Sequence, residues 1–155
     1  MGEMGTAAVT NAAEESFVTL TVAGQICGVP VLAVRDILDA QVITRIPLAP
    51  AEIAGSLNLR GRIVTAIDLR RRLGLAPAPA GVAQMSVVAE QGGELYALMV
   101  DQVSEVMRLP AGAFEPNPST LPRSWAAFSD GIYRLEGRLM VVLDVERVLA
   151  LPVAA

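Results

Sequence analysis

The feature that most constrains this chain is an internal repeat, because two copies of one supersecondary unit dictate the architecture of the whole. Residues 55–69 align without gaps on residues 131–145. Upstream, residues 26–37 align in the same way on residues 95–106. The order of predicted elements is therefore the same in each half of the chain.

Each copy of the longer repeat contains the residues of a tight β-hairpin followed by a short helix. Gly61 and Gly137 permit the positive φ that a two-residue hairpin turn needs. Asp68 and Asp144 can each accept the free amide protons at the start of a helix. Paired catalytic carboxylates are the alternative, but their equal places in a repeat favour helix capping.

Short strands dominate each half, with one brief helical segment, so the sequence predicts a mostly β fold. A second hairpin is expected around Ala23-Gly24, and the prolines and glycine of residues 47–55 allow a short helix there. Each half has only about 60 residues, too few to bury a large core alone. We therefore expect two small closed barrels that share an apolar seam.

The domain limits follow from composition. Residues 1–15 lack any period and predict a flexible N-terminal tail, and residues 16–150 form the folded unit. Within that unit, residues 76–81 (Ala-Pro-Ala-Pro-Ala-Gly) predict a stiff linker between two pseudo-repeated subdomains. Residues 151–155 form a short C-terminal tail.

Composition argues against an enzyme. The chain has no histidine, its 12 basic residues are all arginines, and its only cysteine, Cys27, lies in a predicted strand where a buried side chain is expected. We predict no catalytic residue, cofactor or metal. A net charge of −4 opposes nucleic-acid binding, and no apolar run is long enough to cross a membrane, so a cytoplasmic protein is expected. A small hydrolase or nucleotide-binding enzyme is the remote alternative.

A family resemblance adds to this reading. The segment Ile43-Thr44-Arg45-Ile46-Pro47, then Asn58-Leu59-Arg60-Gly61-Arg62-Ile63-Val64, then Ile67-Asp68-Leu69-Arg70, resembles the signature region of CheW-type domains in order and spacing. The resemblance extends over residues 16–150. It implies two SH3-like five-stranded β-barrels packed together, with short helices.

The resemblance also implies a function. CheW-like proteins are non-enzymatic adaptors that couple the cytoplasmic helical tips of methyl-accepting chemoreceptors to the regulatory domain of the CheA histidine kinase. Such an adaptor is cytoplasmic and is recruited to receptor arrays without direct membrane insertion. A CheW-like adaptor of a non-flagellar system, such as surface motility, is the second possibility.

The family pattern assigns partner-binding positions on this chain, which are Asn58, Leu59, Arg60, Val34, Val103 and Val106. Arg60, beside the turn glycine, is expected to be exposed and to orient a receptor, although a solvated turn residue would look the same. Val34 and Val103 are equally compatible with the core, and Leu59 fits the core better than a contact.

Overall fold

The computed structural model of the protein describes residues 14–150. The predicted tails at residues 1–15 and 151–155 lie outside this range, except for Glu14 and Glu15, which begin the first strand. The first strand thus begins two residues before the predicted start of the folded unit. Within the described range, no helix is long and apolar enough to span a membrane.

The described chain is built from strands linked by very short helices. The first half contains β1 (Glu14–Val22), β2 (Gln25–Pro30), η1 (Val31–Ala33), β3 (Asp36–Leu38), β4 (Ile53–Leu59), β5 (Arg62–Asp68) and α2 (Leu69–Arg72). The second half contains β6 (Met85–Gln91), β7 (Glu94–Val100), β8 (Gln102–Pro110), η2 (Ala111–Ala113), α3 (Arg123–Ala126), β9 (Ser129–Leu135), β10 (Arg138–Leu143) and α4 (Val145–Leu149). The mostly β prediction is confirmed.

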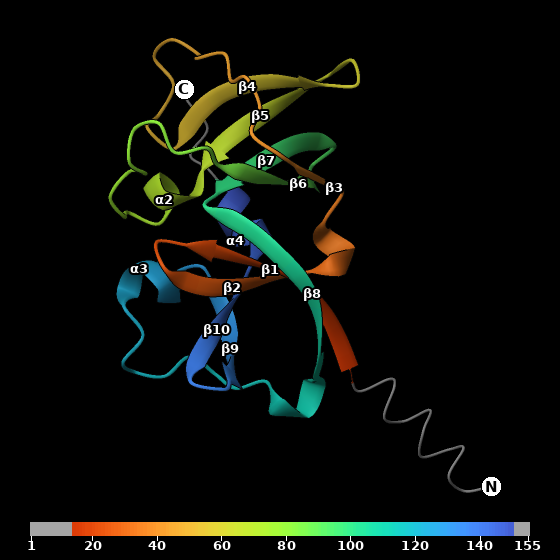
Figure 1. The fold of residues 1–155 in the computed structure, drawn as a ribbon, viewed down its shortest axis with the longest axis vertical. Coiled ribbons are helices and arrows are strands. Elements are labelled where there is room, and N and C mark those ends of the chain that lie inside the picture. Colours follow the sequence, from red (N-terminus) through yellow and green to blue (C-terminus); the bar gives the residue numbers. More distant parts are fainter. Residues whose placement is uncertain (1–13, 151–155) are drawn as a thin grey trace, which may run out of the picture.

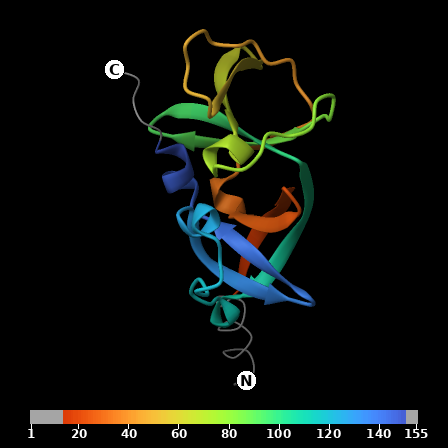
Figure 2. The same ribbon diagram turned by 90° about the vertical axis from the view of Figure 1, so that its left-hand side faces the viewer.

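The strands form two five-stranded sheets, one above the other along the long axis of the molecule (Figure 1). Sheet A has the order β8-β1-β2-β10-β9, and sheet B has the order β3-β6-β7-β5-β4. The helices α2 and α4 lie where the two sheets meet (Figure 2), and α4, which follows sheet A, contacts β6 of sheet B.

The two sequence halves exchange strands. Sheet A takes β1 and β2 from the first half and three strands from the second, and sheet B takes the complementary set. The two sheets are therefore equivalent strand by strand, with β3 matching β8 and β4 matching β9. Residues 76–81, predicted to link two subdomains, instead connect β5 and β6, which are both strands of sheet B.

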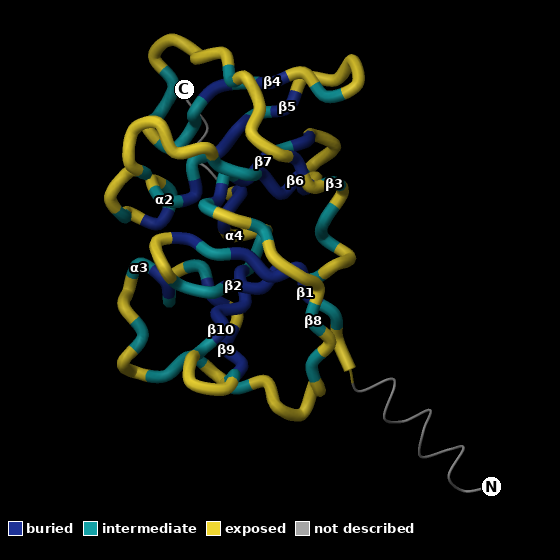
Figure 3. The backbone as a smooth tube through the Cα atoms, in the orientation of Figure 1, coloured by how far each residue is buried: buried dark blue, intermediate teal, exposed yellow. Residues whose placement is uncertain are grey.

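The predicted apolar seam is the largest buried cluster, and we call it the shared cluster because both sheets contribute to it. Sheet A contributes Leu20, Val22, Cys27 and Val29, and sheet B contributes Ile67, Val87, Leu98 and Val100. Each sheet also encloses a smaller cluster of its own, around Val64 in sheet B and around Phe17 in sheet A. Successive side chains of a strand point to opposite faces, so Val87 joins the seam and Val88 the sheet B cluster. Burial is accordingly concentrated along the middle of the molecule (Figure 3).

Local predictions are mostly confirmed, with two corrections. Asp68 accepts a hydrogen bond from the amide of Arg71, and Asp144 accepts one from Arg147, so both cap helices. The sheets have the strand arrangement of SH3-like barrels, but no ladder between described residues joins their edge strands, so the expected full closure is wrong. The short helix expected within residues 47–55 is also wrong, because residues 47–52 form turns and β4 begins at Ile53.

Candidate partner-binding surface

The hairpin between β4 and β5 carries three of the predicted site residues. Arg60 and Gly61 both have positive φ, 51° and 83°, which is the pattern of a type I′ turn. The Asn58 Oδ1 atom accepts a hydrogen bond of 2.9 Å from the Gly61 amide. Asn58 therefore shapes the turn that presents Arg60.

Arg60 is exposed, as predicted, but it has a partner that the sequence analysis missed. Its Nη1 atom lies 2.9 Å from Asp36 Oδ2, and the two side chains are 77% and 26% exposed. Asp36 begins β3, at the opposite edge of sheet B from β4. This ion pair thus joins the two edges of the sheet and orients the guanidinium group. Its two residues lie 24 positions apart, with no local pattern that would have connected them.

A hollow of about 300 Å³ lies beside this ion pair, between the hairpin and β3. Its apolar lining comes from Leu59, Val88 and Leu95. Leu59 is half-buried against the sheet B cluster, so it serves the core, as favoured, while also reaching the hollow. Hairpin, ion pair and hollow form one continuous surface with an apolar centre and a charged rim.

The three valines predicted as partner-binding residues lie near the equivalent edges of the two sheets. Val34 precedes β3, and Val103 is on β8; both are half-buried against the shared cluster. Val106, also on β8, is 57% exposed and pairs with Val18 of β1. The structure therefore separates Val103 and Val106 from the Arg60 hairpin, since they lie on sheet A.

Exposed apolar side chains near these valines were not predicted as site residues. Val31 and Leu32 of η1 and Ile37 of β3 are all exposed, Leu32 almost completely. The segment η1 packs against β1, which pairs with β8. The apolar run of residues 29–34 contains Val31 and Leu32, but the sequence does not show that their side chains are exposed.

A polar cluster fixes β8 relative to sheet B. Arg70 of α2 donates to both carboxylate oxygens of Asp101, at 3.0 and 2.7 Å. Asp101 also accepts a 2.8 Å hydrogen bond from the Ala23 amide in the β1–β2 turn. The hydrogen bonds from Arg70 hold the pKa of Asp101 below its ordinary value. This cluster links the two sheets two residues before Val103.

The side chains that could support catalysis are buried or cap helices. Cys27 is fully buried in β2, and burial raises the pKa of its thiol, which favours the unreactive protonated form. The carboxylates of Asp68 and Asp144 cap separate helices. In residues 14–150, no group of histidine, cysteine and acidic side chains has the arrangement of a metal site.

Comparison with known proteins identifies the family. The CheW-like domain model matches residues 16–152. The chain belongs to the CheW family. It is 29% identical over 140 residues to Chemotaxis protein CheW of Rhizobium meliloti (strain 1021), with 90% of each chain covered. Protein FrzA of Myxococcus xanthus is 29% identical over 105 residues, covering 68% of this chain and 66% of FrzA.

The solved structures agree with this assignment. The scaffolding protein TtCheW from Thermoanaerobacter tengcongensis superposes with a TM-score of 0.78 at 26% identity, covering 88% of each chain. A CheW-family chain is a scaffold in chemotaxis and not an enzyme, as the composition and the resemblance predicted.

Proposed function

We propose that this CheW-family chain is a cytoplasmic adaptor that couples the helical tips of chemoreceptors to a CheA-type histidine kinase in receptor arrays. The observation that carries the proposal is the Arg60–Asp36 pair on the β4–β5 hairpin. It holds a cation in a defined orientation at the rim of an apolar hollow. Such a surface suits an amphipathic helix, whose apolar face needs burial and whose charged side chains need a partner.

The apolar positions on the two sheet edges supply the remaining contact area. Val34 and Val103 are half-buried, and Val106 is exposed. Together with exposed Leu32 and Ile37 they offer apolar surface on both sheets. A scaffold that binds a receptor and a kinase together needs more than one such surface. We assign the hairpin to receptor coupling and these apolar edges to partner contacts.

Charge reversal at Arg60 tests the proposal. Arg60→Glu places two carboxylates face to face, so receptor-dependent control of kinase autophosphorylation should fall strongly in a reconstituted complex. The melting temperature should barely change, because an exposed ion pair contributes less than about 1 kcal/mol. Arg138→Glu, the same change of charge on the β9–β10 hairpin of sheet A, is the control and should keep full control of the kinase. Full kinase control by Arg60→Glu would remove Arg60 from the site.

A second candidate is an adaptor of a non-flagellar chemosensory system, such as one for surface motility. The similarity to a relative with a different name, FrzA, favours keeping it. Affinity purification from the native cell separates the two. Recovery of chemoreceptors with a CheA-type kinase supports the first candidate, and recovery of a different kinase without chemoreceptors supports the second.

A further inference from the structure

One turn in sheet B breaks a local sequence rule. The Ala49 amide donates to the Ile46 carbonyl at 3.3 Å, and the residues between them are Pro47 and Leu48. Proline fixes φ near −65°, and Leu48 has φ 63°, so the signs of φ define a type II turn. The second central position of that turn strongly favours glycine or asparagine.

Leucine at this position does not stabilise the folded state. Its side chain is fully exposed, so it buries no apolar surface to compensate for the left-handed backbone. Ile46, the first residue of the turn, is exposed as well. Residues kept in unfavourable conformations without a structural return are concentrated at functional sites.

The second half of the chain provides an internal control. The segment between β8 and β9 occupies the same place in sheet A as the β3–β4 segment does in sheet B. Three of its large apolar side chains turn inward, since Trp125 is buried in the shared cluster and Leu121 and Phe128 pack against it, whereas Phe114 is 40% exposed. The fold can therefore bury such a segment, and sheet B does not do so around Leu48.

The Leu48 turn is held in place at both sides. Thr44 and Ser56 exchange two backbone hydrogen bonds of 2.8 Å, and the Asp68 amide donates to the Glu52 carbonyl at 2.7 Å. Gly55 is in direct contact with Thr44, where a Cβ atom would collide with the carbonyl oxygen. A turn anchored in this way presents Leu48 with little loss of entropy on binding.

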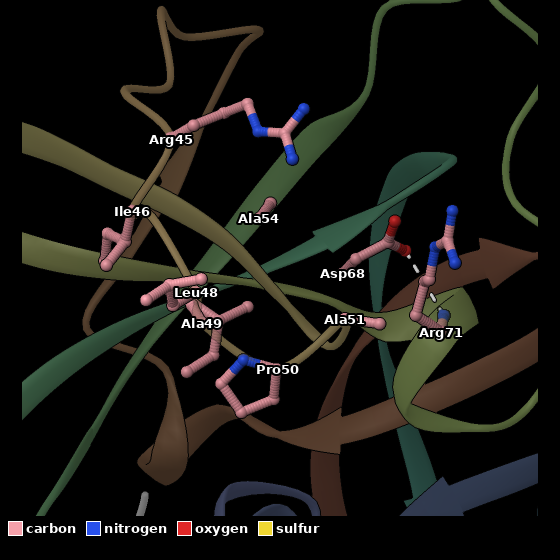
Figure 4. A pocket seen from close by; sticks show the side chains of 10 residues that line it. Arg45, Ile46, Leu48, Ala49, Pro50, Ala51, Ala54, Asp68 and Arg71 are labelled. Carbon is pink, nitrogen blue, oxygen red and sulfur yellow. Dashed lines mark hydrogen bonds between the residues drawn. The ribbon is translucent and has the colours of Figure 1, made fainter.

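Beside the turn lies a hollow of about 420 Å³ with an unusual charge pattern for an acidic protein. Figure 4 shows the guanidinium groups of Arg45 and Arg71 on two sides of it, with Ile46, Leu48 and Pro50 along a third. Within residues 14–150, neither arginine side chain forms an ion pair. The carboxylate in the lining, Asp68, is engaged in capping α2.

We propose that the Leu48 turn and the Arg45–Arg71 hollow form a docking surface for an acidic segment of a partner protein, in which an apolar side chain lies between carboxylates. Charge complementarity selects this occupant, because two arginines that form no ion pair within residues 14–150 flank an apolar ridge. The surface is at the base of the β4–β5 hairpin, and Arg60 is at its tip. The two sites are therefore separate, and this proposal does not depend on receptor coupling.

The first test measures binding by fluorescence anisotropy. The probe is a short labelled peptide with two leucines flanked by glutamates, and the matched probes carry glutamine or lysine in place of glutamate. The glutamate peptide should bind, and Arg45→Glu or Arg71→Glu should weaken it at least about tenfold. Absence of binding by the glutamate peptide, or equal binding of the lysine peptide, would overturn the proposal.

The second test separates a binding role from a structural one. Leu48→Asn relieves the backbone, so its Tm should rise by roughly 2–4 °C, while affinity for the glutamate peptide should fall about tenfold. Val42→Asn, at a similarly exposed aliphatic residue that does not line the hollow, is the control and should leave peptide affinity unchanged. Unchanged affinity in Leu48→Asn would show that the leucine is not a docking residue.

Discussion

The two sheets have the same backbone arrangement at their hairpin ends, where the hairpin lies across a hollow from an edge strand, but they carry different charges there. In sheet B, Arg60 meets Asp36 across the hollow. The repeat places Glu136 and Glu105 at the equivalent positions, and both line the equivalent hollow of sheet A. The hairpin end of sheet B therefore has an ion pair, and the hairpin end of sheet A has two carboxylates.

This difference separates what the fold needs from what function needs. Both sheets keep the turn glycine, the capping aspartate and a bulge beside a glycine, namely Gly55 or Gly131. Sheet A has Glu136 at the turn position where sheet B has Arg60, so the fold does not require a cation there. This contrast supports the proposal that Arg60 serves a partner, whereas the shared glycines serve the backbone.

The largest effect should come from the two bulge glycines, and it should be equal in both sheets. Gly55 and Gly131 have φ of 151° and 157°, and an added Cβ would collide with the Thr44 carbonyl or with Phe114 and the Glu115 carbonyl. Gly55→Ala and Gly131→Ala should each lower the free energy of unfolding by about 3 kcal/mol, because backbone cannot move away cheaply. Urea denaturation measures this.

Gly24→Ala is the control for this prediction, since its Cβ would meet nothing within 4 Å. It should lose only about 1 kcal/mol, the cost of positive φ for a non-glycine residue. If one bulge variant is as stable as Gly24→Ala and the other is not, the two bulges are not equivalent. If both are that stable, the predicted steric collision is wrong.

A smaller loss is expected at the turn glycines, where function should diverge. Gly61 and Gly137 have φ of 83° and 80° with open space around both. Valine at either place should cost about 1–2 kcal/mol through backbone strain alone. Kinase control should fail only in Gly61→Val, because Arg60 shares its turn. Thermal denaturation and the reconstituted kinase assay, performed on both variants, measure the two effects. A Gly61→Val protein that melts like the parent would contradict the turn assignment.

The smallest effect on stability is expected from a charge substitution that makes the hairpin end of sheet A resemble that of sheet B. Glu136→Arg should create in sheet A the ion pair that sheet B already has, with Glu105 as the acceptor. An exposed pair of this kind should raise the free energy of unfolding by no more than about 0.5 kcal/mol. Receptor-dependent kinase control should be unaffected. A gain or loss of that control would mean that the hairpin end of sheet A also contacts a partner.

Elements with local causes were predictable from the sequence, and elements that depend on distant pairing were not. The hairpin at Gly61 and the caps at Asp68 and Asp144 each depend on a few neighbouring residues. The partner of Arg60 was missed because Asp36 reaches it only when β3 and β4 become opposite edges of one sheet. Exposure of Leu48 was missed for the same reason, since its neighbours in space are set by the sheet.

By itself, the sequence determined the repeated unit and the strand-rich class, because these follow from local conformational preference and composition. Only the tertiary structure decided that the halves exchange strands and that residues 76–81 connect two strands of the same sheet. Similar local units can pair within a half or between halves at similar local cost. The choice depends on how the shared cluster packs, which involves residues far apart in the chain.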